Sequence, residues 1–189
     1  DCVNEKDCAI ELTPIEYNIT PHMYNSDTSI ILGNGNKDLG LRIASHFLPK
    51  SLCNCNIGKF SDGEIKIGPI EQNIRKKDCV IIQSIGPTEE YNINDLFIEL
   101  LIIIDALKFA SASSITVMMP VFPYQRQDRK PCSRAPISAR VISKTLEACN
   151  VDRIISFDLH AEQLQGFFHH TPLDNLYSEP YFITYIKNK

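Results

Sequence analysis

The sequence predicts an α/β fold in which a mostly parallel sheet carries helices on both faces, with a small β-hairpin flap. Short apolar runs of strand length alternate with longer segments of helical period along the chain. An Asp-Gly pair separates two strand-like runs over 57–60 and 64–67, which is typical of a hairpin. The 189 residues suffice for one domain of ordinary size, or for one domain and part of another.

The first predicted unit is a strand followed by a helix. Ser29 to Leu32 form a short apolar run, and the glycine-containing turn 33–35 leads into a helical pattern over 38–48. A dinucleotide-binding fingerprint would need glycine where Asp38 stands. We therefore interpret the turn as an ordinary glycine turn into a helix.

Strands and helices then alternate through the rest of the chain. Asn94 or Asp95 is predicted to cap the long helix, which has apolar residues on more than one face. We expect it to lie deep, between the sheet and another element such as a second subunit. Strands are predicted over 79–83, 115–119 and 153–159, and helices over 94–110, 137–149 with a stop at Asn150, 163–168 and 179–189.

The two ends of the chain differ from its middle. Residues 1–28 are polar and lack a sustained period, so we expect an extension outside the core. We interpret 29–175 as the main domain and 176–189 as the start of a second, truncated one. Because the chain begins at Asp1 and stops within a predicted helix, we expect a processed product or a fragment.

Composition limits the kinds of partner. A net charge of -4 disfavours general attraction to nucleic acid, so no nucleic-acid partner is expected. The most apolar stretch, 96–110, is interrupted by charges and too short to span a bilayer, so no membrane is expected either. Cys53 and Cys55 lack a second ligand pair nearby, which argues against structural zinc. We expect reduced thiols in a cytoplasmic protein.

Positive charge is concentrated in one predicted loop, 120–134, which follows a strand. Ligands of α/β proteins bind at the carboxyl ends of strands. Three prolines restrict the loop backbone, so its cations are partly preordered for an anion with several phosphates. An ordinary solvated basic loop is the competing interpretation. The cations are Arg126, Arg129, Lys130 and Arg134, and they face one acid, Asp128.

Asp158 and His160 lie at the end of the next predicted strand. If the two strands are neighbours, this pair and the basic loop face one crevice. The pair is compatible with a Mg²⁺ site, because a phosphate-bound Mg²⁺ takes few protein ligands and keeps several waters. It is also compatible with a hydrogen-bonded histidine of structural role. The adjacent His169 and His170 cannot easily converge and are interpreted as surface residues.

The predicted hairpin turn carries Phe60, Asp62 and Glu64. An aromatic ring beside two acids is compatible with a purine base and its hydrogen-bonding edge, and also with a plain hairpin. Residue chemistry alone thus indicates an α/β domain with an anion-binding crevice, compatible with a Mg-nucleotide. It leaves kinase, transferase and regulatory binding open.

Several stretches match the motifs of one family, with x at the positions that a motif leaves open. They are Lys59-Phe-Ser-Asp-Gly-Glu64, Asn94-Asp95-Leu, Glu99-Leu-Leu101, Ala110-Ser-Ala-Ser113, Pro120-x-Phe-Pro-Tyr-x-Arg-Gln-Asp-Arg-Lys130, Ser133-Arg-Ala-Pro-Ile-Ser-Ala139, Asp158-Leu-His-Ala161, Gln165-Gly-Phe-Phe168, Asp174-Asn-Leu-Tyr177 and Glu179-Pro180. Together and in order, they resemble the amino-terminal half of ribose-phosphate pyrophosphokinase, also called phosphoribosyl pyrophosphate synthetase. The resemblance covers about residues 29 to 189.

The resemblance implies transfer of the diphosphoryl group of ATP to ribose 5-phosphate, which gives phosphoribosyl pyrophosphate and AMP. It implies a type I phosphoribosyltransferase-like fold, used twice per full chain, in a hexamer. The main domain, 29–175, would bind ATP, and the cofactor would be Mg²⁺. By similarity, the ATP site would comprise Arg126, Gln127, Asp128, Arg129 and Lys130, with Phe60, Asp62 and Glu64 from a neighbouring subunit. His160, and more weakly Asp158, would bind the metal.

The sequence also departs from the family pattern. Gly33-Asn-Gly-Asn36 stands where a Ser-Gly-Ser-Ser-like turn is usual, Pro131 stands where some members have an acid, and Asn73 stands where many have serine. Asn73 is near Arg75, which with Ser133 would bind a regulatory phosphate. The family's acidic, Thr/Gly-rich ribose-phosphate loop is missing from this sequence, so we expect the chain to be inactive alone. No catalytic residue is assigned within it, and His160 is the one candidate. A catalytically silent, synthetase-associated regulatory subunit is the alternative.

Overall fold

A parallel sheet forms the centre of the computed structural model, which describes residues 28–47 and 51–189. Its five strands lie in the order β1 (Thr28–Leu32), β4 (Asp78–Ile82), β5 (Ser114–Met118), β6 (Arg153–Phe157) and β7 (Leu173–Leu176). Every neighbouring pair is parallel. Ile31, Ile81, Val117 and Ile154 are fully buried, as expected for strands covered on both faces. The predicted sheet is confirmed.

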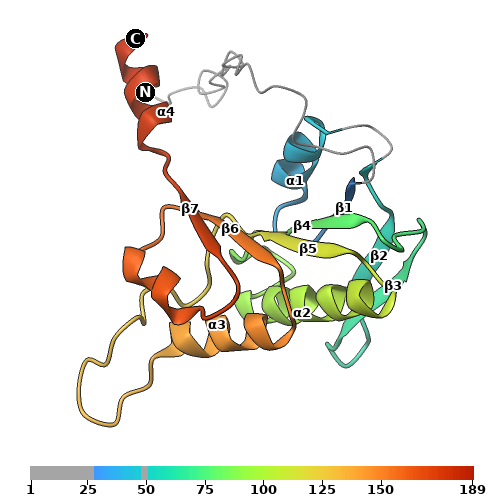
Figure 1. Cartoon of the computed structure of the whole chain (residues 1–189), viewed down its shortest axis with the longest axis horizontal. Coiled ribbons are helices and arrows are strands. Elements are labelled where there is room, and N and C mark those ends of the chain that lie inside the picture. The colour runs from blue at the N-terminus through green and yellow to red at the C-terminus, as the bar shows by residue number, and fades with distance from the viewer. Residues whose placement is uncertain (1–27, 48–50) are drawn as a thin grey trace, which may run out of the picture.

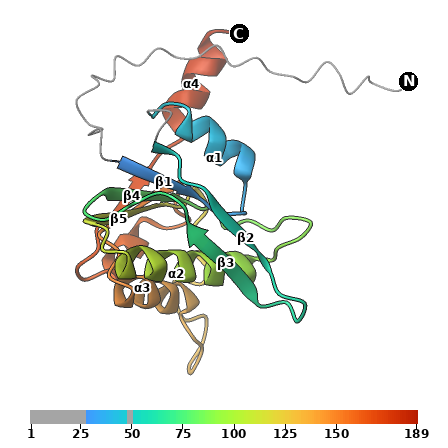
Figure 2. The ribbon, with the colours of Figure 1, turned by 90° about the vertical axis from the view of Figure 1, so that its right-hand side faces the viewer.

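Helices lie on both faces of the sheet (Figure 1). One face is covered by α1 (Lys37–Ala44) and the other by α2 (Ile93–Phe109) and α3 (Ser138–Ala148), and the view turned by 90° agrees (Figure 2). The last helix, α4 (Glu179–Lys187), extends away from the sheet on the side of α1, and none of its residues is buried. The predicted layers are confirmed.

The hairpin flap consists of the antiparallel strands β2 (Cys55–Lys59) and β3 (Ile65–Ile70), with an irregularity in register between Cys55 and Ile57. Gly63 has a φ of 94°, a conformation that favours glycine, and this explains why an Asp-Gly pair occupies the turn. The hairpin packs beside α2 through β3. It lies at the end of the sheet where β1 is the edge strand.

The start of α2 was predicted two or three residues too late. Asn92 is the N-cap: its side-chain oxygen accepts hydrogen bonds from the backbone N–H groups of Asn94 and Asp95, at 2.8 and 3.1 Å. The Asp95 carboxylate in turn accepts from the backbone N–H of Asn92 at 3.1 Å, which completes a capping box. Asn94 and Asp95, which were predicted as the cap, lie in the first turn of the helix instead.

We expected α2 to lie deep, between the sheet and another element such as a second subunit, and its burial agrees with this only in part. Leu96, Leu100 and Leu107 are fully buried against the sheet, whereas Ile98 and Ile102 are 47% and 37% exposed. The sheet and β3 thus pack against α2, and the described residues leave the side that carries Ile98 and Ile102 exposed.

Two further differences concern the end of α1 and strand β7. The helix predicted to reach residue 48 ends at Ala44, and residues 48–50 lie outside the described part of the chain, as do residues 1–27 of the predicted extension. Strand β7 was not predicted at all. Among the described residues, no helix has the length and apolar character needed to cross a membrane.

Candidate anion-binding site

The basic loop and the Asp158/His160 segment lie at the same edge of the sheet. Strands β5 and β6 are hydrogen-bonded neighbours, with Met118 opposite Ile155. Beyond the strands, the backbone N–H of Met119 donates to Ile155 O at 2.8 Å and that of Phe157 to Pro120 O at 3.3 Å. The condition that the two strands are neighbours is therefore met, and both segments follow their carboxyl ends.

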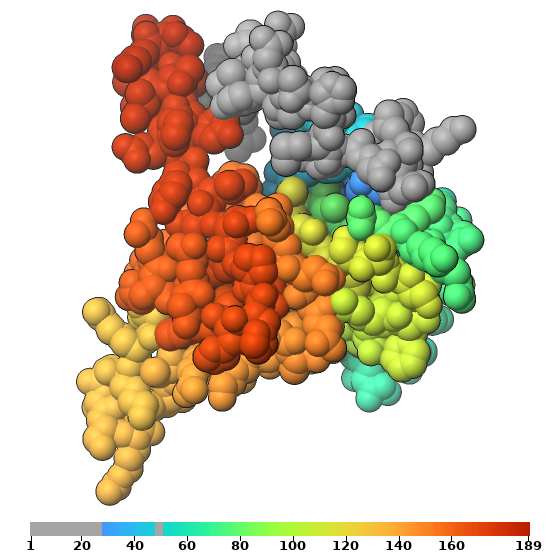
Figure 3. Space-filling model, viewed as in Figure 1, coloured from blue at the N-terminus to red at the C-terminus, as the bar shows by residue number. Residues whose placement is uncertain are grey.

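The basic loop protrudes from the body of the molecule, as the gold segment of the space-filling view shows (Figure 3). Its base is anchored by buried Phe122, whose ring meets Phe168 edge-on at a centroid distance of 6.3 Å. The cations beyond this anchor are exposed, and none of the ion pairs found in the described part of the chain involves them. The loop therefore presents uncompensated positive charge to solvent.

Two polar residues of the loop are held by neighbouring elements. The side-chain oxygen of Gln127 accepts a hydrogen bond from the Ser138 hydroxyl, and its backbone oxygen accepts from Ala139 N at 3.2 Å. Asp128 is only 9% exposed, and its carboxylate accepts from Gln163 Nε2 at 3.0 Å. These contacts fix the loop beside α3 and beside the short 3-10 helix Glu162–Phe167. The proposed contacts of both residues with ATP stay predictions.

Asp158 and His160 are both exposed, but only one of the two side chains has a hydrogen bond within the described residues. The hydroxyl and the backbone N–H of Ser178 donate to the Asp158 carboxylate, and both lower the pKa of Asp158. The backbone N–H of His160 donates to Gln125 Oε1 at 2.9 Å, which connects this segment to the basic loop. Asp158 thus has a structural contact, and the imidazole of His160 faces solvent.

No group of three or more metal-ligating side chains occurs among the described residues. A carboxylate and an imidazole at one strand end still fit the sparse protein contribution that a phosphate-bound Mg²⁺ needs, since such an ion takes its other ligands from water and phosphates. The same finding applies to Cys53 and Cys55, which are free thiols whose pKa values are raised by burial.

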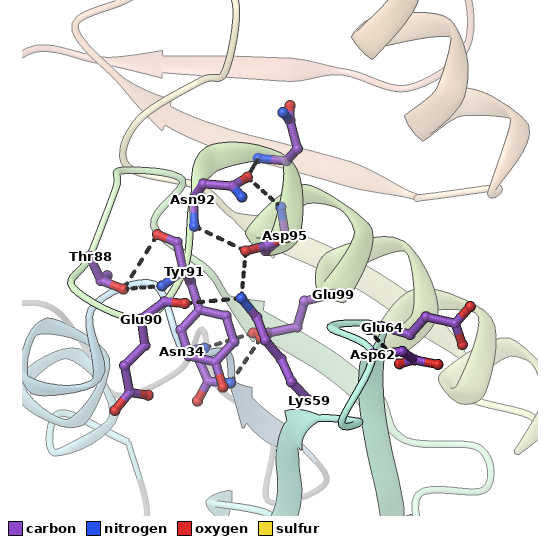
Figure 4. A network of polar contacts seen from close by, with 11 residues as sticks. Asn34, Lys59, Asp62, Glu64, Thr88, Glu90, Tyr91, Asn92, Asp95 and Glu99 are labelled. Atoms are coloured by element: carbon purple, nitrogen blue, oxygen red, sulfur yellow. Dashed lines mark hydrogen bonds and ion pairs between the residues drawn. The ribbon is translucent and has the colours of Figure 1, made fainter.

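The hairpin turn with Phe60, Asp62 and Glu64 does not reach the basic loop of the same chain, because the two lie on different sides of the molecule (Figures 1 and 2). Phe60 is 50% exposed, and Lys66 Nζ lies 5.5 Å from the centroid of its ring. Asp62 Oδ1 accepts from the backbone N–H of Glu64 at 3.1 Å (Figure 4). The turn is therefore available for a ligand, but one chain alone does not join it to the cations.

The stem of the hairpin is fastened to the start of α2. Lys59 Nζ lies 2.7 Å from Asp95 Oδ2, donates to Glu90 O at 3.0 Å, and lies 4.8 Å from the centroid of the Tyr91 ring (Figure 4). The hydrogen bond from Lys59 is the largest influence that lowers the pKa of Asp95. Because Asp95 also belongs to the capping box, one carboxylate stabilises both the helix start and the hairpin stem.

A buried polar network that the sequence reasoning missed lies under the turn after β1. Glu99 is fully buried, and its carboxylate accepts hydrogen bonds from the backbone and side chain of Asn34 and from Gln83 Nε2. Burial raises the pKa of Glu99, while these donors oppose the shift. A single acid on the apolar face of a predicted helix was the signal that could have revealed it, since a buried carboxylate requires donors.

The residues expected at a regulatory phosphate site are not brought together. Arg75 precedes β4 and Ser133 follows β5, so they lie at opposite edges of a parallel sheet within one chain. Arg75 lines a cavity of about 350 Å³ between β3 and the end of α2. A phosphate that contacts both residues would need two subunits, and the assignment stays a prediction.

His169 and His170 are exposed, as expected, and they contact the rest of the chain through their backbone N–H groups. Their N–H groups, at 2.6 and 2.7 Å, and that of Thr171, at 3.3 Å, all donate to Glu147 Oε1 at the end of α3. Partial burial acts to raise the pKa of Glu147, but the three donors outweigh it and the pKa lies below its usual value. The contact is structural and lies outside the candidate site.

The fold and the site define an α/β domain that presents cations at the carboxyl edge of a parallel sheet, the usual place for a phosphorylated ligand in this class. Residues 28–149 match the N-terminal domain of ribose phosphate pyrophosphokinase. The chain belongs to this family.

The names of similar proteins support the assignment to this family. Ribose-phosphate pyrophosphokinase A of Dictyostelium discoideum is 45% identical over 158 residues, which are 84% of this chain and 48% of the relative. Ribose-phosphate pyrophosphokinase 4 of Saccharomyces cerevisiae is 44% identical over 161 residues, 85% of this chain and 48% of the relative. The chain spans about half the length of these relatives.

A solved structure supports the fold. The crystal structure of phosphoribosylpyrophosphate synthetase from Mycobacterium smegmatis matches with a TM-score of 0.78 at 34% sequence identity, over 86% of this chain and 52% of that one. The family and fold expected from the motifs are thereby confirmed.

Proposed function

We propose that the chain is the ATP-binding half of an enzyme that transfers the β,γ-diphosphoryl group of ATP to the 1-hydroxyl of ribose 5-phosphate, giving phosphoribosyl pyrophosphate and AMP. The observation that carries the proposal is the set of exposed cations after β5, beside His160, which form no ion pair with any described residue, in a member of this family. Such chemistry depends mainly on placing two substrates and neutralising phosphate charge.

The roles divide between the loop and the hairpin. Arg126, Arg129 and Lys130 contact the phosphates directly, whereas Asp128 and Gln127 act at the base of the loop, where neighbouring side chains hold them. Phe60, Asp62 and Glu64 contact adenine. Because the hairpin turn lies away from the loop of its own chain, this part of the site comes from a neighbouring subunit of a homo-oligomer.

Magnesium is the proposed cofactor. His160, with Asp158 as a weaker contributor, would hold the ion at the carboxyl end of β6, with nucleotide phosphates and water as its remaining ligands. The ion would neutralise charge on the phosphates. The chain's own task is to keep the imidazole facing solvent beside the cations, which the Gln125 contact to the His160 backbone supports.

The experiment is a calorimetric titration of the chain with ATP, with and without Mg²⁺, followed by an assay for AMP release with ribose 5-phosphate. We expect saturable ATP binding that weakens with added salt, and no AMP from this chain alone, because it spans about half the length of its relatives. Absence of ATP binding would contradict the proposal, and AMP release would contradict the assignment as one half of the site.

A further inference from the structure

The side chain of Gln125 connects the basic loop to the segment that carries His160. Gln125 precedes Arg126, at a position that the family motif of this loop leaves open. Its Oε1 accepts a hydrogen bond from the backbone N–H of His160 at 2.9 Å. The contact joins two loops that follow different strands, since the residues are 35 positions apart in the sequence.

A second hydrogen bond also has its acceptor in the basic loop. Asp128 Oδ2, also in the basic loop, accepts from Gln163 Nε2 at 3.0 Å. The basic loop thus supplies both acceptors and the segment 158–163 supplies both donors. Among the described residues, these are the side-chain hydrogen bonds that fix this segment relative to the loop.

The opposite side of the segment is held by β7 and by the connection from β7 to α4. Leu159 N donates to Asn175 Oδ1, and Ser178 N donates to Asp158 Oδ1, both at 3.0 Å. The backbone of Asp158 has a φ of 43°, in the region that residues other than glycine rarely adopt, so the strand end turns sharply here. These contacts fix the segment to the sheet edge but not to the cations of the basic loop.

We propose that Gln125 is a positioning residue: it holds the backbone of His160 against the basic loop, so that one polyphosphate with its metal ion meets both the cations and the imidazole. The inference rests on the proposed function. Gln125 has this role rather than Asp128, because its bond ends on His160 itself. Since His160 is exposed and Gln125 is half-buried, water replaces the lost bond in a variant, and the effect falls on ligand placement rather than on folding.

The test compares Gln125→Met, which has similar length but no acceptor oxygen, with Gln125→Glu, which keeps one. The matched control is Gln72→Met, because Gln72 Oε1 accepts the exposed backbone N–H of Asn54 at 2.8 Å, the same kind of bond at the hairpin. Two quantities are measured on the 189-residue chain: backbone amide hydrogen exchange by NMR, and ATP affinity with and without Mg²⁺ by calorimetry.

In Gln125→Met we expect His160 amide exchange to rise roughly tenfold and ATP affinity in Mg²⁺ to fall roughly threefold to tenfold, the range for one lost hydrogen bond. Metal-free ATP affinity should change less. Gln125→Glu should restore the protection of the His160 amide, and Gln72→Met should alter Asn54 exchange only.

Unchanged His160 exchange in Gln125→Met, or faster exchange with unchanged ATP affinity in Mg²⁺, would overturn this inference but not the proposed function. A wild-type chain that binds no ATP would instead overturn the proposed function and the inference with it.

Discussion

The carboxylate of Glu99 accepts the backbone N–H of Asn34 at 2.7 Å, which joins the middle of α2 to the turn after β1. The same carboxylate accepts Asn34 Nδ2 and Gln83 Nε2, both at 2.9 Å, and Gln83 Oε1 accepts Gly35 N at 3.1 Å. One buried acid therefore arranges the turn at the carboxyl ends of β1 and β4. The polar groups of Asn34 and the backbone N–H of Gly35 in this turn are thereby paired.

Glu99→Ala should destabilise the chain strongly, because it leaves buried donors on Asn34 and Gln83 without their acceptor. With roughly 1–3 kcal/mol for each unsatisfied buried donor, we expect a loss of about 3 kcal/mol or more in the free energy of unfolding. Urea denaturation measures it. Exposed Glu89→Ala is the control and should stay within about 0.5 kcal/mol of wild type. A loss below about 1 kcal/mol in Glu99→Ala would show that water replaces the acid.

Gly35→Ala should be destabilising for a steric reason. A Cβ at Gly35 would lie 1.7 Å from the backbone oxygen of Ser84, so the backbone must move. We expect a cost of roughly 1–3 kcal/mol. At Gly58 in β2 a Cβ meets nothing within 4 Å, so Gly58→Ala should be neutral or slightly stabilising. Thermal unfolding of both variants checks this, and equal midpoints would contradict it.

Lys59→Met should raise the pKa of Asp95 toward its ordinary value, because the largest influence that lowers it disappears. The Asn92 backbone bond remains, so the return should be partial. A carboxyl with a depressed folded pKa adds stability above its unfolded pKa and loses it as pH falls through the folded pKa. The stability difference should be below about 1 kcal/mol near neutral pH, since the pair is partly exposed, and should vanish in acid.

Carboxyl NMR titration of Asp95 is the measurement for this pair. Lys66→Met, on the other hairpin strand, is the control and should leave the Asp95 titration unchanged. An Asp95 titration in Lys59→Met that matches wild type would mean that the ion pair does not form in solution.

Glu147→Gln should reduce stability in a pH-dependent manner. Glutamine keeps an acceptor for the N–H groups of His169, His170 and Thr171 but loses the charge. Because the folded pKa of Glu147 is depressed, the wild-type advantage should be complete above the ordinary glutamate pKa near 4.3 and decline as pH falls below it. Urea unfolding at pH 7 and near pH 3 compares the two. An advantage independent of pH would contradict a charge-based contact.

The sequence was sufficient to predict the elements whose local signals agree with their burial. The apolar runs of β4, β5 and β6 and the Asp-Gly turn at Gly63 are examples, because strand burial and positive φ have direct residue preferences. Strand β7 was missed because it is only four residues long and contains Asp174 and Asn175, which are poor strand formers. Its pairing with β6 overrides that preference.

The candidate site was also predictable in part. The basic loop and the segment with Asp158 and His160 each follow a strand, and adjacent parallel strands end at one edge of the sheet, so their proximity follows from the sequence pattern. The Gln125 to His160 and Asp128 to Gln163 bonds were not predictable, because they depend on side-chain directions across two loops. The separation of the hairpin turn from the loop likewise depends on where β2 and β3 pack.

Arg126→Ala and His160→Ala should weaken ATP binding differently. Arg126 is exposed and has no ion-pair partner in residues 28–47 or 51–189, so its charge is free for a phosphate. Its loss should reduce ATP affinity roughly tenfold to a hundredfold with or without Mg²⁺, as for one hydrogen-bonded charge. Loss of His160 should reduce only the gain in affinity that Mg²⁺ provides, because the imidazole would act through the metal.

Calorimetric titration at two Mg²⁺ concentrations separates the two effects. Arg140→Ala on α3, also an exposed arginine but outside the loop, should bind ATP as the wild type does. Because exposed charges are screened by salt, the difference between Arg126→Ala and wild type should shrink as ionic strength rises, whereas the Arg140 variant should show no such trend. If all three variants bind alike, the cations after β5 do not form the phosphate site, and the ligand must be sought at another edge of the sheet.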